Sequence, residues 1–174
     1  MKKLYLSIGI IILLFLFTNC TTRSDSKESY SAVTGFLQNL YTVSAQDVKD
    51  YNNIQKAGIV DPTGIENINK KFKPLMTADA YEGMLRNCTY LNIVKDVANK
   101  GCKIKKCSLT LTDASESSNT VQYSYTAVLT IQMNDTQKDQ DITESGSVQT
   151  EKQNNSWKVN YINRSAPAKF FIKS

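Results

Sequence analysis

The chain contains no histidine among its 174 residues. This absence excludes catalytic sites that depend on an imidazole, such as the Ser–His–Asp triad and Cys–His pairs, and metal sites with histidine ligands. Arginine is scarce too, because lysine supplies all but three of the 21 cationic side chains. The net charge is only +5, and the basic residues are scattered along the chain. We therefore expect no nucleic-acid partner.

A long hydrophobic run is also missing, although a short one follows the basic start Met1–Lys3. The apolar stretch from Leu4 to Phe17 would span ~21 Å as a helix, whereas a bilayer core of ~30 Å needs about 20 residues. A basic start followed by a short apolar stretch is typical of a secretory signal. We expect residues 1–19 to be a signal peptide.

The residues that follow the apolar stretch, Phe17-Thr18-Asn19-Cys20, are similar to a bacterial lipobox. The resemblance implies that a lipid is attached to the sulfur of Cys20 and that cleavage makes Cys20 the first residue. The alternative is an uncleaved signal anchor in which Cys20 is incidental. Both interpretations place the rest of the chain at the extracytoplasmic face of a bacterial membrane.

The segment after Cys20 is polar and is predicted to be a flexible tether over residues 20–29, which leaves residues 30–174 as one domain. Apolar residues then recur at helical spacing in the N-terminal half. Ser44 is expected to cap one of these helices, with Asp47 at its third position. The helices predicted here cover residues 30–41, 45–56, 65–72, 78–87 and 91–99.

After Gly101 the hydrophobic period changes to 2 residues, the period of a strand with one buried face. Short polar turns separate these segments, and such turns join antiparallel strands. The strands predicted here cover residues 107–112, 121–133, 141–152 and 157–161. Helices followed by strands predict an α+β domain, in which N-terminal helices pack on one curved antiparallel sheet of four or more strands.

Three features make the chain similar to the nuclear-transport-factor-2-like, or cystatin-like, superfamily in its lipoprotein form. They are an aromatic-bearing first helix, the segment Phe72–Tyr81, and a meander that ends in Ser156–Tyr161. The resemblance covers residues 29–163 and implies a cone, in which a curved sheet wraps around a long helix. It also implies a homodimer through the outer face of the sheet. The superfamily contains isomerases and cyclases, and also non-catalytic assembly modules of transfer machines.

Enzymes that resemble this group place an acid, often beside a histidine, inside the cone. The predicted inner face of the 121–133 strand carries no carboxylate, and Glu144 is the one acid expected at an inward strand position. Asp79 and Glu82 are interpreted as a helix-dipole residue and a solvated residue. We therefore expect no catalytic residue, no metal and no cofactor.

Four aromatic residues of the predicted strands could line a ligand cavity inside the cone: Tyr123, Tyr125, Trp157 and Tyr161. The alternative is that these side chains fill the core between helix and sheet. The favoured hypothesis is a surface-anchored, non-catalytic binding or assembly module, with a protein partner in the cell envelope such as a transfer or secretion machine. The second hypothesis is a carrier or sensor of a small apolar ligand.

Three cysteines remain beyond Cys20, so at most one pair can form within a monomer. Cys102 and Cys107 would lie ~16 Å apart on one extended strand, far beyond the ~6 Å that a disulfide spans. Two possibilities stay open: Cys88 pairs with Cys102 or Cys107, or all three are free buried thiols.

Overall fold

The computed structural model describes residues 21–57, 62–117, 119–134 and 138–166, so the predicted signal and Cys20 lie outside the described residues. The helices are α2 (Thr21–Leu40), α3 (Ala45–Ala57), α4 (Pro62–Asn69), the short 3₁₀ helix η1 (Lys70–Phe72), α5 (Ala78–Arg86) and α6 (Thr89–Lys100). The strands are β1 (Cys102–Glu116), β2 (Thr120–Met133), β3 (Asp139–Gln153) and β4 (Ser156–Ala166). Helices precede strands, which confirms the predicted α+β class.

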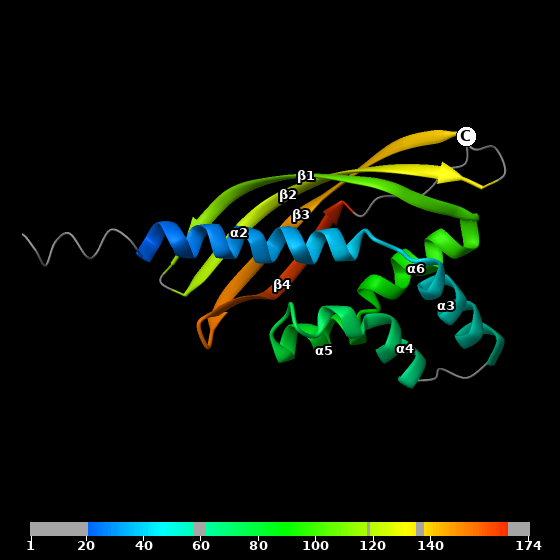
Figure 1. Ribbon diagram of the computed structural model, residues 1–174, viewed down its shortest axis with the longest axis horizontal. Coiled ribbons are helices and arrows are strands. Elements are labelled where there is room, and N and C mark those ends of the chain that lie inside the picture. Colours follow the sequence, from blue (N-terminus) through cyan, green and yellow to red (C-terminus); the bar gives the residue numbers. More distant parts are fainter. Residues whose placement is uncertain (1–20, 58–61, 118, 135–137, 167–174) are drawn as a thin grey trace, which may run out of the picture.

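The four strands form one antiparallel sheet in the order β1-β2-β3-β4. The sheet is curved and open, and it arches over α2, whereas α3 to α6 gather beside one end and one edge of it (Figure 1). In the described part of the chain, no helix is both long and apolar enough to cross a membrane.

The core lies between α2 and the sheet. One stripe of α2 and the residue that follows it are buried: Val33, Phe36, Leu37, Leu40 and Tyr41. Alternate residues of β2 are buried as well: Val121, Tyr123, Tyr125, Ala127, Leu129 and Ile131. Both patterns follow from hydrophobic periodicity, because a helix repeats its face every 3.6 residues and a strand every 2 residues.

The start of α2 differs from the sequence prediction, because residues 21–29 are helical and do not form a tether. Ser29 is fully buried, and its Oγ lies 2.7 Å from Thr150 Oγ1 on β3. The Tyr123 hydroxyl donates a hydrogen bond to the same Ser29 Oγ at 3.0 Å. A polar segment can thus remain helical here because the hydroxyl that it buries finds partners on the sheet. The tether prediction is wrong, and the folded domain begins before residue 30.

A β-bulge interrupts the predicted alternation of β4. Val159 pairs with Thr150, but the next residue of β3, Gln149, pairs with Tyr161, which leaves Asn160 as an extra residue. An extra residue moves every following side chain to the other face of the strand. Tyr161 is consequently 56% exposed and does not line the interior, which corrects its predicted role as a cavity residue.

The corner between α2 and α3 is closed by the predicted helix cap. Ser44 N donates to Asp47 Oδ2 at 2.8 Å, and Asp47 N donates to Ser44 Oγ at 3.1 Å. This reciprocal pair satisfies backbone groups that a helix start leaves open. The prediction that Ser44 caps the second helix is confirmed.

Candidate functional site

Among the described residues, Glu144 on β3 has a fully buried carboxylate on the inner face of the sheet. Glu144 pairs across the sheet with Ala127 of β2, whose small side chain leaves room on the inner face. Burial of a carboxylate is costly unless hydrogen bonds and an opposite charge compensate it. The residues around Glu144 therefore decide what this acid can do.

Arg164 of β4 supplies the opposite charge. Its Nη2 donates to Glu144 Oε2 at 2.8 Å, and its Nε donates to Oε1. The hydroxyl of Tyr41, directly after α2, donates to Oε1 at 2.6 Å. The hydroxyl of Tyr125 on β2 lies 3.4 Å from Oε1 and 3.2 Å from the Tyr41 hydroxyl. We call these four residues, Glu144, Arg164, Tyr41 and Tyr125, the interior cluster.

The two tyrosines and the arginine of the interior cluster stay protonated near neutral pH, because the pKa of each is raised. Burial, and then the neighbouring Tyr125 and Glu144, raise the pKa of Tyr41 far above its ordinary value, and burial raises the pKa of Tyr125 to about 12. Burial opposes the charge of Arg164, but hydrogen bonds to Glu144 and the charge of Glu144 outweigh it and raise the pKa of the guanidinium. Both tyrosines are therefore hydrogen-bond donors, and both oxygens of Glu144 are engaged.

Gly146 allows Tyr125 to reach the carboxylate. These two residues pair across β2 and β3. A Cβ on residue 146 would lie 2.1 Å from the carbonyl oxygen of Asn163 and 2.8 Å from Cε1 of Tyr125. Only glycine permits both the backbone of β4 and the tyrosine ring to approach this closely.

The predicted cavity residues do not surround a common space. Tyr123 and Tyr125 are buried under α2, and the Tyr123 ring contacts Tyr30 edge-on at a centroid distance of 6.2 Å. Trp157 is 9% exposed, and Tyr161 lies on the outside. The buried rings pack as the core-filling alternative describes.

The three described cysteines are free, so neither disulfide considered for Cys88 is formed. Cys102 Sγ lies 3.8 Å from the carbonyl oxygen of Val97, a backbone partner within its own neighbourhood. Burial, with Asp96 nearby, raises the pKa of the Cys102 thiol to about 11. Burial, with Glu144 nearby, raises the pKa of Cys107 to about 11. Both thiols are thus protonated and weakly reactive at neutral pH.

Sequence reasoning missed two members of the interior cluster. Tyr41 belongs to the predicted apolar stripe, which gives no sign that its hydroxyl meets an acid. The strand period alone would place Arg164 outside, and the bulge at Asn160 turns it inward; a second register shift of β4 lies between Asn163 and Ala166. One signal was available, since Arg164 is one of only three arginines in the chain and stands at the end of a strand.

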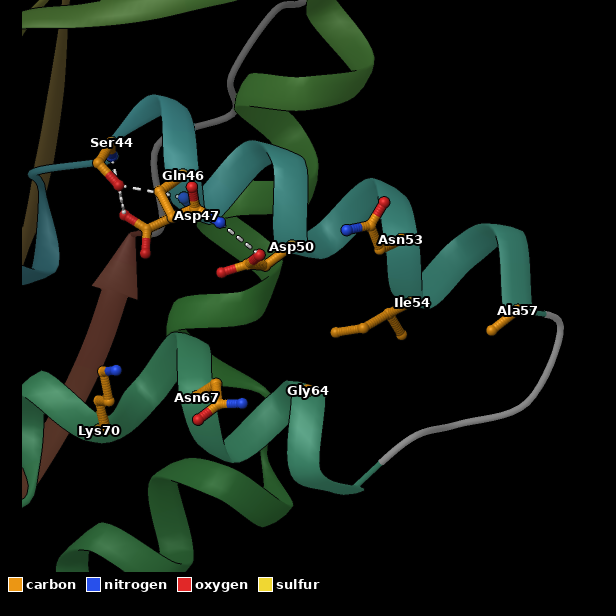
Figure 2. Close-up of a pocket in the computed structure, with 10 residues that line it drawn as sticks. All are labelled: Ser44, Gln46, Asp47, Asp50, Asn53, Ile54, Ala57, Gly64, Asn67 and Lys70. Carbon is orange, nitrogen blue, oxygen red and sulfur yellow. Dashed lines mark hydrogen bonds between the residues drawn. The ribbon is translucent and has the colours of Figure 1, made fainter.

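An open groove lies between α3 and α4 (Figure 2). Its volume is about 530 Å³, within the usual range for ligand sites. The groove is lined by Ser44, Gln46, Asp47, Asp50, Asn53, Ile54, Ala57, Gly64, Asn67 and Lys70. Side-chain amides of Asn53 and Asn67 come from the two facing helices, and Ile54 adds an apolar surface between them (Figure 2). We call this the α3–α4 groove.

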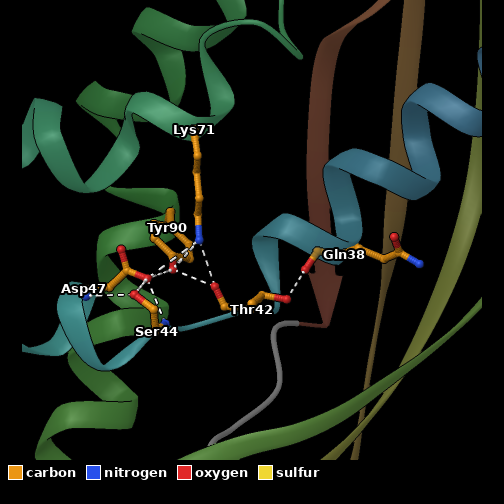
Figure 3. Close-up of polar contacts among 6 residues, drawn as sticks. All are labelled: Gln38, Thr42, Ser44, Asp47, Lys71 and Tyr90. Atoms are coloured by element: carbon orange, nitrogen blue, oxygen red, sulfur yellow. Dashed lines mark hydrogen bonds and ion pairs between the residues drawn. The ribbon is translucent and has the colours of Figure 1, made fainter.

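A second polar cluster fixes one wall of the α3–α4 groove (Figure 3). Lys71 Nζ donates to the Thr42 carbonyl oxygen at 2.8 Å and to the Tyr90 hydroxyl at 2.7 Å. The Tyr90 hydroxyl lies 2.9 Å from Asp47 Oδ2, and Lys71 Nζ lies 4.1 Å from the centre of the Tyr90 ring. Burial lowers the pKa of Lys71, and Asp47 acts against this shift. The Asp47 carboxylate is therefore engaged by Ser44, Tyr90 and Lys71.

No protein-family model matches the chain, and no curated protein matches it. Among solved structures, a protein described as a calcium/calmodulin-dependent protein kinase II association domain, from Xanthomonas campestris, is similar over 59% of this chain and 75% of its own, with 14% identity and a TM-score of 0.29. The intermembrane-space region of the chloroplast protein ARC6 is similar over 60% of this chain and 98% of its own, with 15% identity and a TM-score of 0.27. Likenesses at this level assign neither a family nor a function.

Proposed function

We propose that the protein is a non-catalytic binding or assembly module, attached through a lipid on Cys20 to the extracytoplasmic face of a bacterial membrane. In this proposal the α3–α4 groove receives a protein partner of the cell envelope. The observation that carries the non-catalytic part is the state of Glu144, whose two carboxylate oxygens are engaged by Arg164 and Tyr41.

A general acid or base must reach a proton on a substrate. Glu144 is fully buried beneath α2, and Arg164 forms a two-point contact with it. Bidentate pairs between arginine and carboxylate are among the strong hydrogen-bonded contacts in proteins. This geometry favours a structural role for the only carboxylate that we assign to the inner face.

The α3–α4 groove has the features of a surface that binds a short peptide segment. The amides of Gln46, Asn53 and Asn67 combine donors and acceptors, which suits the alternating groups of a peptide backbone. Ile54 offers an apolar contact in the same groove. The α2–α3 corner is held by several hydrogen bonds, so little ordering is required when a partner binds.

Metabolic labelling tests the anchor. Labelled palmitate should enter the wild-type protein and not Cys20→Ser, and the variant should leave the membrane fraction. A Cys20→Ser protein that stays as firmly in the membrane would favour the uncleaved signal anchor instead.

Site-specific crosslinking tests the groove. A photo-reactive amino acid at Asn53 should give a crosslinked envelope protein, whereas one at Ser124, an exposed position of β2, should not. The product at Asn53 should disappear with Asn67→Trp on α4, which fills the groove. It should persist with Asn52→Trp, an exposed position of α3 that does not line the groove. Equal crosslinking from both positions, or none from Asn53, would contradict the proposal.

Native mass spectrometry separates this proposal from the second hypothesis, a carrier of a small apolar ligand. The protein extracted from membranes should carry no small molecule other than its own lipid. A co-purifying apolar compound, released on unfolding, would favour the carrier.

A further inference from the structure

Helix α2 begins at Thr21, directly after Cys20. No flexible tether therefore separates the proposed lipid attachment site from the folded domain. The segment from Thr21 to Ser29 spans about 12 Å as a helix at 1.5 Å per residue. The same segment would reach about 30 Å if it were fully extended. A lipid on Cys20 would therefore hold the domain much closer to the bilayer than a tether would.

The first half of α2 is also attached to the sheet, so it cannot swing freely. Ser29 contacts Thr150 of β3 and accepts a hydrogen bond from Tyr123 of β2. One turn earlier, the carbonyl oxygen of Ser26 accepts a second contact from the Tyr123 hydroxyl at 3.4 Å. The ring of Tyr30 packs edge-on against Tyr123. These contacts fix the axis of α2 relative to the strands.

The contact between Ser29 and Thr150 shows how far the start of α2 extends relative to the β3–β4 turn. Thr150 lies beside Ser29, and the strand continues from Thr150 for three residues to Gln153, about 10 Å at 3.3 Å per residue. Helix α2 continues in the same direction from Ser29 to Thr21, about 12 Å. The start of α2 thus reaches the level of the β3–β4 turn. Figure 1 shows this end of α2, the β1–β2 turn and the β3–β4 turn at one end of the molecule.

We infer that α2 is a rigid strut that seats the domain end-on on the bilayer, so that the β1–β2 and β3–β4 turns face the lipid headgroups. This inference rests on the proposed lipid at Cys20 and adds the orientation of the domain. The described residues at the tips of the turns are exposed and carry neutral hydroxyl and amide groups: Ser117, Asn119, Asn154, Asn155 and Ser156. Such groups can hydrogen-bond to lipid headgroups without burying a charge.

The same orientation places the α3–α4 groove away from the membrane. Helix α2 has 20 residues, so its two ends are about 30 Å apart. Because α3 follows the far end of α2, the groove stands roughly that distance above the lipid surface (Figure 1). A partner can then approach the groove from the side opposite the bilayer.

Short-range fluorescence quenching tests the orientation with the full, lipidated protein in vesicles of phosphatidylethanolamine and phosphatidylglycerol. A fluorescent amino acid is placed at Asn154, in the β3–β4 turn, or at Asn53, in the α3–α4 groove; both positions are exposed. Lipids with a nitroxide on the headgroup should remove most of the emission at Asn154 and leave the emission at Asn53 unchanged. Equal quenching at the two positions, or stronger quenching at Asn53, would overturn the inference.

An insertion before α2 tests whether the rigid helix sets the distance between the domain and the bilayer. Six Gly and Ser residues between Cys20 and Thr21 should greatly reduce the quenching at Asn154, because the domain can then leave the lipid surface. An unchanged quenching pattern would show that α2 does not set the height of the domain. Flotation of the vesicles distinguishes the two proposals: protein that fails to float contradicts the lipid anchor, whereas protein that floats without site-selective quenching contradicts only the strut.

Discussion

Arg164, near the end of the edge strand β4, donates hydrogen bonds from Nε and Nη2 to the two oxygens of the buried Glu144 carboxylate. The Glu144 side chain is fully buried, and that of Arg164 is 17% exposed. Removal of one partner from a buried ion pair leaves an uncompensated charge and costs about 3–5 kcal/mol. We expect Arg164→Met to lower the free energy of unfolding by about this amount, as measured by urea denaturation.

Two further variants test whether the effect of Arg164→Met comes from the ion pair with Glu144 and not from the loss of any arginine. Arg86→Met removes an exposed partner of Glu82, so it should change the free energy of unfolding by less than about 1 kcal/mol. The double variant Glu144→Leu/Arg164→Met removes both charges and should recover much of the stability that Arg164→Met loses. If Arg164→Met and Arg86→Met were equally mild, Glu144 would not depend on Arg164.

Gly146 and Gly35 make a matched pair of substitutions. Gly146→Ala places a methyl group 2.1 Å from the Asn163 carbonyl oxygen, and backbone cannot give way as a side chain can. We expect a loss above about 3 kcal/mol or no folded protein, because overpacking of this severity is among the most damaging changes. Gly35→Ala lies within α2, and beyond the adjacent backbone of its own helix nothing lies within 4 Å of the new methyl, so it should stabilise the protein by about 0.5–1 kcal/mol. Thermal unfolding of both variants checks these opposite signs.

The free thiols can be counted chemically. In denaturant, a Cys20→Ser protein should react with three equivalents of a thiol reagent, and its intact mass should not change on reduction. In the folded protein at pH 8, Cys102 and Cys107 should react slowly, because burial raises the pKa of each to about 11. Increased mass after reduction would instead establish a disulfide.

Alkaline pH should destabilise the fold. Burial is the main reason why the pKa values of Tyr41, Tyr90 and Tyr125 are raised from 10.0, and for Tyr125 the value reaches about 12. Below pH 10 each phenol is protonated in both states, so the tyrosines cause no loss of stability there. Above pH 10 only the unfolded chain releases these protons, so stability falls by about 1.4 kcal/mol per pH unit for each tyrosine. The thiols of Cys102 and Cys107, raised from 9.0 to about 11, begin this decline at pH 9.

Tyr41→Phe isolates one contribution to this decline. The variant removes one proton from the linkage, so its stability should fall less steeply above pH 10 by about 1.4 kcal/mol per pH unit. Urea unfolding from pH 8 to pH 11 measures both slopes. Identical slopes for the variant and the wild type would mean that the Tyr41 phenol is not shielded in the folded state.

Local patterns in the sequence were sufficient for most of the fold. The stripe that ends at Tyr41, the cap formed by Ser44 and Asp47, and the alternation from Val121 to Met133 depend on spacings of a few residues. Such spacings fix which face of an element is apolar, and an apolar face must be covered. The α+β arrangement followed from these features before any tertiary contact was known.

The interior cluster depends on a contact that no local pattern encodes. Asn160 is an extra residue only relative to β3, and its presence turns Tyr161 outward and Arg164 inward. The prediction for the start of α2 differs from the structure for a similar reason. Ser29 looks like part of a polar linker in the sequence, and its burial requires the hydroxyls of Thr150 and Tyr123 from distant strands.

Ser29 gives the most direct test of the ordered start of α2. Ser29→Ala removes a buried acceptor of the Tyr123 hydroxyl at 3.0 Å and the hydroxyl that contacts Thr150 at 2.7 Å. Loss of a buried hydrogen-bond partner costs about 1–3 kcal/mol. Amide hydrogen exchange in residues 25–28, whose N–H groups have carbonyl acceptors within α2, should be slow in the wild type and faster in Ser29→Ala. Ser31→Ala, at an exposed position of the same helix, should leave it unchanged. Unprotected amides in the wild type would return this segment to a flexible tether, since only hydrogen-bonded helix resists exchange.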